Sequence, residues 1–362
     1  MIFLFILLII CAVYQISYQL VLIITIAKHK QSKNPVSTNL PSVSVVICAK
    51  NESDNLQKNL PFILNQKYVD FEVILVDDGS DNPFIMNAER LKIITLSKEE
   101  KVGLGKKYAL QKGVENASKE LVLLTDADCQ PASENWISEM ASLINEQHKI
   151  VLGISPYRYE TTFLNALIEY ETAQTALQYL GFALLGKPYM SVGRNVLYDA
   201  KLLKSKTFTT KEMSISSGDD DFAIQTLANS INTTVCLSKD SYTYSDAKKT
   251  WKTWFQQKTR HYQSGFQYKL VHKMLLGNYI FTKIGLYVLF FCTLCIQNKI
   301  NVLYLLPVIV TMMVTCIAIM QFHKTLTLLK RWNYTLILDP IYGAMLLCIG
   351  LLNLFQSNQK WK

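Results

Sequence analysis

The stretch LVLLTDADCQ (residues 121–130) is a short apolar run that ends in two acidic residues. Its first four residues are leucine or valine, and Asp126 and Asp128 follow with one residue between them. A continuous apolar run of this length, without alternation, is typical of a strand buried on both faces of a parallel sheet. The stretch therefore predicts a buried strand that delivers two carboxylates to its carboxyl end.

Similar apolar runs recur through the middle of the chain. VSVVICA (43–49), FEVILVDDGS (71–80) and LKIITL (91–96) predict three more buried strands, and the segments 56–66 and 106–117 predict helices between them. This alternation predicts an α/β fold with a mainly parallel, Rossmann-like sheet that helices cover. Ligands bind such sheets beyond the carboxyl ends of the strands. Two acidic pairs fall at those ends, namely Asp77 with Asp78 and Asp126 with Asp128.

Both ends of the 362-residue chain are apolar and nearly free of charge. Residues 1–27 contain no charged side chain. They are long enough to cross a bilayer, which needs about 20 residues at a rise of about 1.5 Å each. A signal peptide would need a basic start, a shorter apolar core and a small-residue cleavage site, so we predict an uncleaved transmembrane anchor instead. Further apolar stretches near 278–297, 301–320 and 334–355 predict three transmembrane helices within residues 277–355.

Basic segments predict how these helices are oriented. KHKQSK (28–33) follows the first span, and HKTLTLLKRW (323–332) separates the last two spans. Because basic loops remain in the cytoplasm, the middle of the chain is predicted to be cytoplasmic and both chain ends to lie outside. Lys283 is close to the cytoplasmic start of its span, where its amine can extend to the interface. Lys360 and Lys362 in the tail count against this topology.

The formal net charge of +9 indicates contact with anionic lipid rather than with nucleic acid. Many basic residues lie beside the apolar segments, and the sequence shows no nucleic-acid-binding motif. The mixture of aromatic and basic residues over 251–275 predicts amphipathic interfacial helices within 246–276. Residues 163–185 also predict a helix, either at the membrane interface or in the core. Cys292 and Cys295 lack a second cysteine pair, so we expect neither a zinc site nor a disulfide framework.

The D-x-D of residues 126–128 has the chemistry of a divalent-metal site. Mg²⁺ and Mn²⁺ prefer hard oxygen ligands, usually one or two carboxylates together with phosphates of the substrate. Because alternate residues of a strand point to opposite faces, the two carboxylates converge only if a turn begins just past the strand. The motif is short, and two solvated loop acids are the alternative interpretation.

A second acidic cluster, GDDDFAIQ (218–225), opens an amphipathic helix. Three adjacent aspartates repel one another and should raise the pKa of at least one of them. Acids at a helix N-terminus are also favoured by the helix dipole, which is the purely structural interpretation. A carboxylate with a raised pKa that faces a metal-bound nucleotide would instead serve as a general base.

Two groups of polar residues are candidate phosphate contacts. GLGKKYAL (103–110) lacks the Walker spacing, so we expect no ATP site, but Lys106 or Lys107 at a helix start could meet a phosphate. Gln257 and Arg260 are three residues apart, on one face of their predicted helix. Arginine can hold a phosphate through two parallel hydrogen bonds, and contact with lipid headgroups is the alternative.

Taken in order, these motifs resemble those of membrane-bound family 2 glycosyltransferases of the GT-A fold, which are related to the Q-x-x-R-W polysaccharide synthases and lipid glycosyltransferases. The resemblance covers roughly residues 40–275, through VSVVICAKNE, EVILVDDGSDN, GKKYAL, LTDAD, GRN at 193–195, SGDDDF and Q-x-x-R. It implies a GT-A domain over residues 40–245, flanked by transmembrane helices. It also implies inverting transfer of a sugar from a nucleotide-diphosphate donor, expected to be UDP-linked, to a hydroxyl of a membrane-associated glycan or lipid.

The resemblance implies roles for individual residues. Contacts to the nucleotide sugar are expected from Ala49, Asn51, Glu52, Asp77, Asp78, Lys106 and Asp126. Asp126 and Asp128 would bind Mg²⁺ or Mn²⁺. Asp220 would be the catalytic base, with Asp219 beside it, and Asp219 and Asp221 remain alternatives. The acceptor and the diphosphate would meet Gly193, Asn195, Gln257, Arg260 and His261. His261 stands where related enzymes usually carry tryptophan, which leaves the acceptor and any processivity open.

Two other functions remain open at this point. One is a processive polysaccharide synthase, and the other is a non-enzymatic membrane scaffold with a degenerate transferase domain. Every acidic motif is present, which favours an enzyme, and only three predicted spans follow the domain, which favours transfer of a single sugar. We therefore expect a role in cell-envelope polysaccharide or glycolipid synthesis at a bacterial inner membrane.

Overall fold

The computed structural model describes residues 2–29, 40–97, 99, 103, 105–297, 302–326 and 330–355. The chain divides into two compact units. We call them the sheet unit, with described residues 40–158 and 182–247, and the helical unit, with described residues 2–29, 159–181 and 248–355 apart from the gaps above. Most of the basic segment 28–33 and the tail with Lys360 and Lys362 lie outside the described residues.

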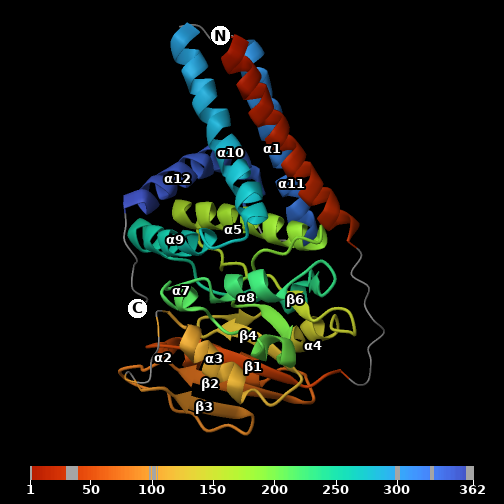
Figure 1. Cartoon of the computed structure of the whole chain (residues 1–362), viewed down its shortest axis with the longest axis vertical. Coiled ribbons are helices and arrows are strands. Elements are labelled where there is room, and N and C mark those ends of the chain that lie inside the picture. The colour runs from red at the N-terminus through yellow and green to blue at the C-terminus, as the bar shows by residue number, and fades with distance from the viewer. Residues whose placement is uncertain are drawn as a thin grey trace. The chain divides into compact units, whose positions relative to one another are not determined.

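Seven strands form the main sheet of the sheet unit, in the order β3-β2-β1-β4-β7-β6-β8 (Figure 1). β1 pairs in parallel with β2 and β4, β2 pairs in parallel with β3, and β6 with β8. β7 runs antiparallel to both of its neighbours, β4 and β6. The strand bounds are β1 Val43–Ala49, β2 Phe71–Asp77, β3 Leu91–Thr95, β4 Leu121–Asp126, β6 Ile150–Leu152, β7 Val196–Asp199 and β8 Thr233–Val235. The mainly parallel α/β fold is therefore confirmed.

Helices cover both faces of this sheet. On one face, α2 (Ser53–Leu64) and α4 (Trp136–Ala141) bury apolar side chains against those of β1 that point the same way. On the other face lies α3 (Lys107–Asn116), where a Cβ at Gly113 would stand only 2.5 Å from a methyl carbon of Val46. Only glycine allows this close approach, which seats the helix directly on β1.

Three shorter helices follow β7, and a small second sheet completes the sheet unit. The helices are α6 (Ala200–Lys204), α7 (Thr210–Met213) and α8 (Asp219–Leu227). The second sheet pairs β5 (Gln130–Pro131) with β9 (Thr243–Tyr244). After β4 the chain thus adds β6, β7 and β8 to the main sheet, and α8 carries the second acidic cluster.

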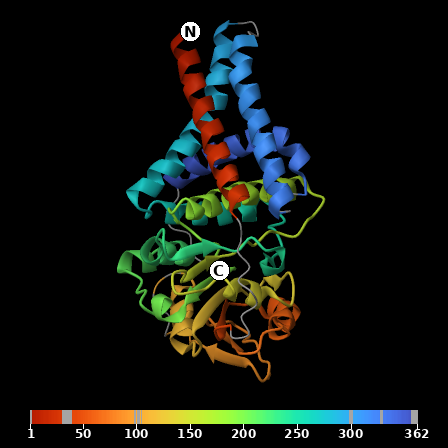
Figure 2. The ribbon, with the colours of Figure 1, turned by 90° about the vertical axis from the view of Figure 1, so that its right-hand side faces the viewer.

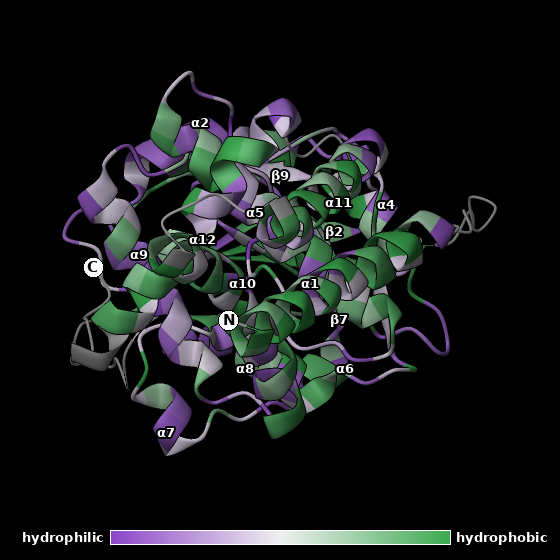
Figure 3. Ribbon diagram, turned by 90° about the horizontal axis from the view of Figure 1, so that it is seen from above, coloured by the Kyte–Doolittle hydropathy of each residue, from purple (hydrophilic) through white to green (hydrophobic). Residues whose placement is uncertain are grey.

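Four helices in the described part of the chain are long and apolar enough to cross a membrane. They are α1 (Ile2–Lys28), α10 (Leu270–Gln297), α11 (Val302–Leu326) and α12 (Thr335–Phe355). Within the helical unit, α1, α10 and α11 lie side by side and α12 runs across them (Figures 1 and 2). Hydrophobic residues extend along these helices (Figure 3). This is the pattern of helices whose outer faces meet lipid rather than water.

Two further helices, α5 (Phe163–Leu184) and α9 (Trp251–Gly265), belong largely to the helical unit. Residues 159–181 group with the apolar helices, whereas the sequence placed them within the range 40–245. Most side chains of α5 are buried, which favours a core helix of this unit. α9 ends at Gly265 and α10 begins at Leu270, so residues 251–275 contain the whole of α9 and the start of α10.

Lys283 of α10 differs from its prediction. Its side chain is fully buried and forms an ion pair with Asp339 of α12, which is also buried. The expectation that its amine extends to the interface is wrong, because a buried carboxylate within the protein provides a stronger partner than distant water.

Candidate functional site

The loops after β1 and β2 form one connected shelf at the carboxyl edge of the sheet. The Asp78 N–H donates to the Ala49 carbonyl at 2.7 Å, which joins the two strand ends. The Ser80 N–H donates to Asp77 Oδ1 at 2.8 Å and so turns the chain just past β2. Asp77 and Asp78 are both buried, although they are charged residues. These hydrogen bonds therefore fix the two loops relative to each other at this edge of the sheet.

Asn51 extends this shelf with an unusual backbone conformation. Its φ is +54°, in the left-handed region, which asparagine tolerates better than most residues. Its side chain is paired with Asp81: Nδ2 donates to Asp81 Oδ2 at 3.1 Å, and the Asp81 N–H donates to Oδ1 at 2.9 Å. Glu52 precedes α2 and accepts a hydrogen bond from Asn55 Nδ2 at 2.5 Å. Five of the predicted nucleotide-sugar residues, Ala49, Asn51, Glu52, Asp77 and Asp78, therefore share one edge.

Lys106 lies between the two acidic clusters. Its Nζ donates to Asp126 Oδ1 at 2.7 Å and lies 3.5 Å from Asp219 Oδ2. Burial alone would lower the pKa of Lys106, but the carboxylates of Asp126 and Asp219 outweigh it and hold the pKa well above its ordinary value. Lys106 is therefore a permanent cation that links the end of β4 to the start of α8.

Asp126 and Asp128 both stay partly open to solvent. Asp126 is the last residue of β4, and the Cys129 N–H donates to its carbonyl at 3.1 Å, so a turn begins just past the strand. Asp128 Oδ1 accepts from Cys129 Sγ at 3.4 Å. The two carboxylates offer the hard oxygen atoms that Mg²⁺ and Mn²⁺ prefer.

The described residues contain no group of three or more His, Cys, Asp and Glu side chains arranged to hold a metal ion. This observation is compatible with a cation at Asp126 and Asp128, because Mg²⁺ commonly takes one or two carboxylates and completes its shell with substrate phosphates and water. The donor set thus fits a metal that is shared with a phosphorylated ligand rather than held in a closed protein cage.

Lys107, the next residue along, has a structural role that the sequence did not reveal. Its side chain is fully buried, and Nζ donates to the carbonyls of Ile215 at 2.7 Å and Ser217 at 2.9 Å. Gly105, with φ of +75°, brings the backbone so close to Ser216 that a Cβ would stand 2.3 Å from its carbonyl oxygen. These contacts fix the loop that leads into α8. The sequence KK after a glycine gave no sign of which lysine points inward.

Asp220 faces the GRN segment through one short hydrogen bond. The Gly193 N–H donates to Asp220 Oδ2 at 2.6 Å, and a Cβ at position 193 would press on the carboxyl group at 3.1 Å. Burial raises the pKa of Asp220 well above its ordinary value, Asp221 and Asp219 raise it further, and Lys106 and the Gly193 N–H oppose the rise. The result is a carboxylate that is more basic than a solvated aspartate, held in one orientation.

The rest of the GRN segment holds the framework together. Asn195 is fully buried, donates to the carbonyls of Ile154 at 2.7 Å and Ser241 at 2.8 Å, and accepts from Trp136 Nε1 at 3.0 Å. Arg194 donates to Ser245 Oγ at 2.8 Å and the Ser155 carbonyl at 3.0 Å. In this structure, Asn195 therefore serves the packing of the sheet unit, and its predicted role on the acceptor side stays a prediction.

Gln257, Arg260 and His261 lie on α9 in the helical unit. The same helix carries Lys258, which the sequence did not single out; it is buried and donates to Glu171 Oε1 of α5 at 2.6 Å. The structure thus gathers the other predicted site residues in the sheet unit, while the Q-x-x-R segment is part of the packing of the helical unit.

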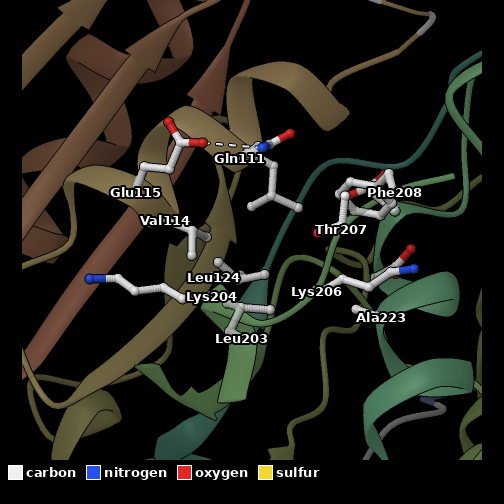
Figure 4. Close-up of a pocket in the computed structure, with 13 residues that line it drawn as sticks. Gln111, Val114, Glu115, Leu124, Leu203, Lys204, Lys206, Thr207, Phe208 and Ala223 are labelled. Atoms are coloured by element: carbon white, nitrogen blue, oxygen red, sulfur yellow. Dashed lines mark hydrogen bonds between the residues drawn. The ribbon is translucent and has the colours of Figure 1, made fainter. Parts of the chain in front are cut away.

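A pocket lies beside the acidic helix, between α3, α6 and α8 (Figure 4). Its volume is about 260 Å³. Leu124 and Leu203 contribute apolar walls, Lys204 and Lys206 lie along it, and Gln111 donates to Glu115 at 3.1 Å on one side (Figure 4). Asp219 and Asp220 complete the lining. The acids of α8 therefore border open space on the α3 face of the sheet.

The comparisons with known proteins concern the family and the fold of the chain. The model of the family described as glycosyl transferase family 2 matches residues 44–205. This match assigns residues 44–205, a little less than half of the chain, to a family 2 glycosyltransferase domain. A glycosyltransferase of Haloferax volcanii is 29% identical over 119 residues, which are 30% of this chain and 38% of that protein. A probable glycosyltransferase of Bacillus subtilis is 25% identical over 299 residues, 74% of this chain and 67% of that protein.

The fold of the chain also has a solved counterpart. A mannosyltransferase of Pyrobaculum calidifontis, solved with GDP-Man and Mn²⁺, superposes with a TM-score of 0.61 at 15% identity, covering 97% of this chain and 99% of that one. At this identity the likeness shows the GT-A fold. The chain spans about two fifths of the first curated relatives it matches, 38% and 42% of their lengths.

Proposed function

We propose that this protein is an inverting glycosyltransferase that moves a sugar from a nucleotide-diphosphate donor to a hydroxyl of a membrane-associated glycan or lipid. The observation that carries the proposal is the Asp220 carboxylate, which the Gly193 N–H orients at 2.6 Å within an acidic cluster that Lys106 links to Asp126. The family 2 domain supports the reaction class. The four long apolar helices support an acceptor in or at a membrane.

The donor would lie along the carboxyl edge of the sheet. The connected shelf of Ala49, Asn51, Asp77 and Asp78 supplies fixed hydrogen-bonding groups for a nucleoside, and we expect uridine from the motif resemblance. The related fold of the mannosyltransferase was solved with GDP-Man and Mn²⁺, which supports a nucleotide sugar as the class of donor.

Asp126 and Asp128 would hold a divalent cation, Mg²⁺ or Mn²⁺, through their carboxylate oxygens. When bound, such an ion neutralises the diphosphate and makes it a better leaving group. Lys106 lies 2.7 Å from Asp126 and carries a permanent positive charge that can meet a phosphate oxygen. The chain therefore brings cationic charge to the place where negative charge grows during transfer.

Asp220 would take the proton from the acceptor hydroxyl. The acceptor oxygen forms its bond to the anomeric carbon, the bond from that carbon to the diphosphate breaks, and the nucleoside diphosphate leaves with the electron pair. The raised pKa of Asp220 suits this role, since a more basic carboxylate accepts the proton more readily. Attack from the face opposite the diphosphate inverts the anomeric centre.

The membrane side of the proposal follows from charge. His323 and Lys324 lie in the last turn of α11, and Lys330 and Arg331 lie before α12. Basic residues at such a helix connection remain on the cytoplasmic side. We therefore propose that the sheet unit works in the cytoplasm. The test places a cysteine at an exposed position of α2 and treats sealed cells with a thiol reagent that does not cross membranes. Labelling of this cysteine without permeabilisation would contradict the proposed topology.

Asp220→Asn tests the reaction. Loss of the general base should lower the transfer rate by about 100- to 10,000-fold. Nucleotide binding, measured as thermal stabilisation by UDP or GDP with Mn²⁺, should remain. Asp240→Asn, at an exposed acid outside the cluster, is the matched control and should transfer at the wild-type rate. A rate within a few-fold of wild type in Asp220→Asn would remove Asp220 from the mechanism.

The scaffold alternative gives a different result in the same experiment. A degenerate domain should show neither transfer nor stabilisation with any nucleotide sugar of a broad panel. A processive synthase would instead pass the Asp220 test but yield a ladder of product masses rather than a single added sugar.

A further inference from the structure

The inference concerns Lys106 and rests on the proposed function. We propose that Lys106 acts as an internal cation that occupies Asp126 and Asp219 in the empty enzyme, so that the divalent metal binds tightly only together with the nucleotide diphosphate. The Lys106 side chain would then determine that tight binding of the metal depends on the nucleotide diphosphate.

The geometry places the ammonium of Lys106 where a cation is needed. Nζ is 2.7 Å from Asp126 Oδ1 and 3.5 Å from Asp219 Oδ2, and it therefore joins the D-x-D motif to the acidic start of α8. The side chain of Lys106 is only 20% exposed, that of Asp126 35% and that of Asp219 9%. A lysine this enclosed, with two carboxylate partners, is not a freely moving surface charge.

The backbone around Lys106 keeps it in this position. Lys107 is anchored to the carbonyls of Ile215 and Ser217, and the backbone at Gly105 lies against Ser216. These contacts hold the start of α3 against the loop that leads into α8. The Lys106 side chain consequently begins next to both acidic clusters and can move only at its flexible end.

Charge explains why the empty site should resist a metal ion. Asp126 and Asp219 together carry two negative charges, and Lys106 already neutralises one of them. A divalent cation at Asp126 would have to displace the ammonium or remain within a few ångströms of it, and repulsion at that distance weakens binding strongly. Asp128 alone offers one carboxylate, which is few for Mg²⁺ or Mn²⁺.

A diphosphate removes this conflict. Its negative oxygens offer Lys106 a second partner, and the flexible stem of lysine lets the ammonium turn from carboxylate to phosphate. Asp126 is then released to the metal, and the phosphates supply the remaining oxygen ligands. Metal and diphosphate should therefore bind with positive coupling, each tightening the other by the same factor.

The test measures binding of MnCl₂ alone to the full-length protein in detergent, by the electron paramagnetic resonance signal of free Mn²⁺. Wild type should bind weakly, and saturating UDP should tighten Mn²⁺ at least tenfold. Lys106→Met should tighten Mn²⁺ alone by roughly tenfold or more, because a nearby positive charge is gone. The same variant should bind UDP more weakly at saturating Mn²⁺. Effects of opposite sign on the two ligands are not produced by partial unfolding, which weakens both.

Matched variants separate Lys106 from a general charge effect. Lys112→Met removes a lysine from the same helix that pairs with Glu115, and it should leave both affinities unchanged. Lys106→Arg keeps the positive charge and should bind Mn²⁺ as weakly as wild type. Adding Asp126→Asn to Lys106→Met should abolish the gain, since the released carboxylate is the ligand.

Several results would overturn the inference. Wild type that binds Mn²⁺ equally tightly with and without UDP would contradict it, and this measurement needs no variant to fold. Unchanged or weaker Mn²⁺ binding in Lys106→Met would also contradict it, as would a gain that persists without Asp126. No sugar transfer is measured, so these outcomes leave the role of Asp220 untouched, and failure of the Asp220 test would leave the Lys106 result standing.

Discussion

Two of the lysine–aspartate pairs among the described residues, Lys283–Asp339 and Lys106–Asp126, have opposite character. Lys283 and Asp339 in the helical unit are 0% and 1% exposed. Lys106 and Asp126 in the sheet unit are 20% and 35% exposed. The first pair is sealed inside the protein, whereas the second lies at an edge that a ligand can reach.

Their partners differ as well as their burial. Asp339 also accepts hydrogen bonds from the hydroxyls of Tyr170 and Tyr287, so both of its oxygens are used within the helical unit. Lys106 is shared between Asp126 and Asp219 and can exchange one negative partner for another. An ionisable residue within an apolar helix is by default a functional candidate, but the complete set of partners at Asp339 indicates a structural role.

The α5 helix shows how far this structural polarity extends. Glu169, Tyr170 and Glu171 are consecutive and buried, and each has a different partner: Arg331, Asp339 and Lys258 respectively. Gln174 adds a bond to Gln19 of α1 at 3.2 Å. Since a helix surrounded by protein must satisfy polar groups on every side, these contacts fix its rotation. The helical unit therefore uses buried charge for specificity of packing.

Breaking the sealed pair should have the largest effect on stability. Asp339→Ala leaves the Lys283 ammonium buried without its carboxylate, which should lower the free energy of unfolding by about 3–5 kcal/mol. Thermal unfolding of the purified protein in one detergent measures this loss. The double variant Lys283→Met with Asp339→Leu should recover most of it, because neither charge then remains buried. A single variant as stable as wild type would show that the pair is not sealed.

Acid titration of Glu169 should have an intermediate effect. Burial raises the pKa of Glu169 to about 7, and Arg331 and Lys330 only partly oppose it. The folded state then binds the proton more tightly than the unfolded state. The contribution of Glu169 to the free energy of unfolding is therefore fully present below about pH 4.3. It is lost as the pH rises towards 7, which should lower the free energy of unfolding by roughly 1–3 kcal/mol.

Glu169→Gln is the control for this pH dependence. Unfolding of wild type and variant should be compared between pH 4.5 and pH 8, where the difference in their stability should change steadily and then level off above pH 7. Parallel curves would mean that Glu169 is ionised throughout and that the Arg331 ion pair dominates its environment.

Breaking the open pair should have the smallest effect on stability. Asp126→Asn removes a partly exposed ion pair, which should cost less than about 1 kcal/mol of unfolding free energy. Stabilisation by a nucleotide diphosphate with Mn²⁺ should nevertheless disappear. A large loss of stability with ligand binding retained would reverse the comparison and assign Lys106–Asp126 to structure.

The sequence predicts the sheet unit better than the helical unit, for physical reasons. A buried parallel strand can be predicted from a local apolar run. The sequence therefore predicts β1, β2, β3 and β4, together with the acids that follow β2 and β4. β7 is short and antiparallel and depends on pairing with β4, which no local pattern records. Ion pairs between distant helices are equally invisible, because Lys283 and Asp339 are 56 residues apart.

Within the site, the residue types were predictable but their directions were not. The order of motifs pointed to Lys106, Asp126 and Asp220, whereas only the fold shows that Lys107 turns inward. Asn195 illustrates the converse: its motif suggested an acceptor contact, and its three buried hydrogen bonds tie strand to loop. A motif predicts which residue types are present at the site, and the packing of the fold determines which of them a ligand can contact.

One measurement tests the central claim most directly. Purified full-length protein in native lipid is incubated with Mn²⁺ and a panel of nucleotide sugars, and lipid and glycan products are identified by mass spectrometry. We predict that one donor yields a product heavier by a single sugar residue, and that Asp220→Asn yields none while Asp240→Asn yields as much as wild type. The same product, at the same rate, from Asp220→Asn would contradict the proposed mechanism.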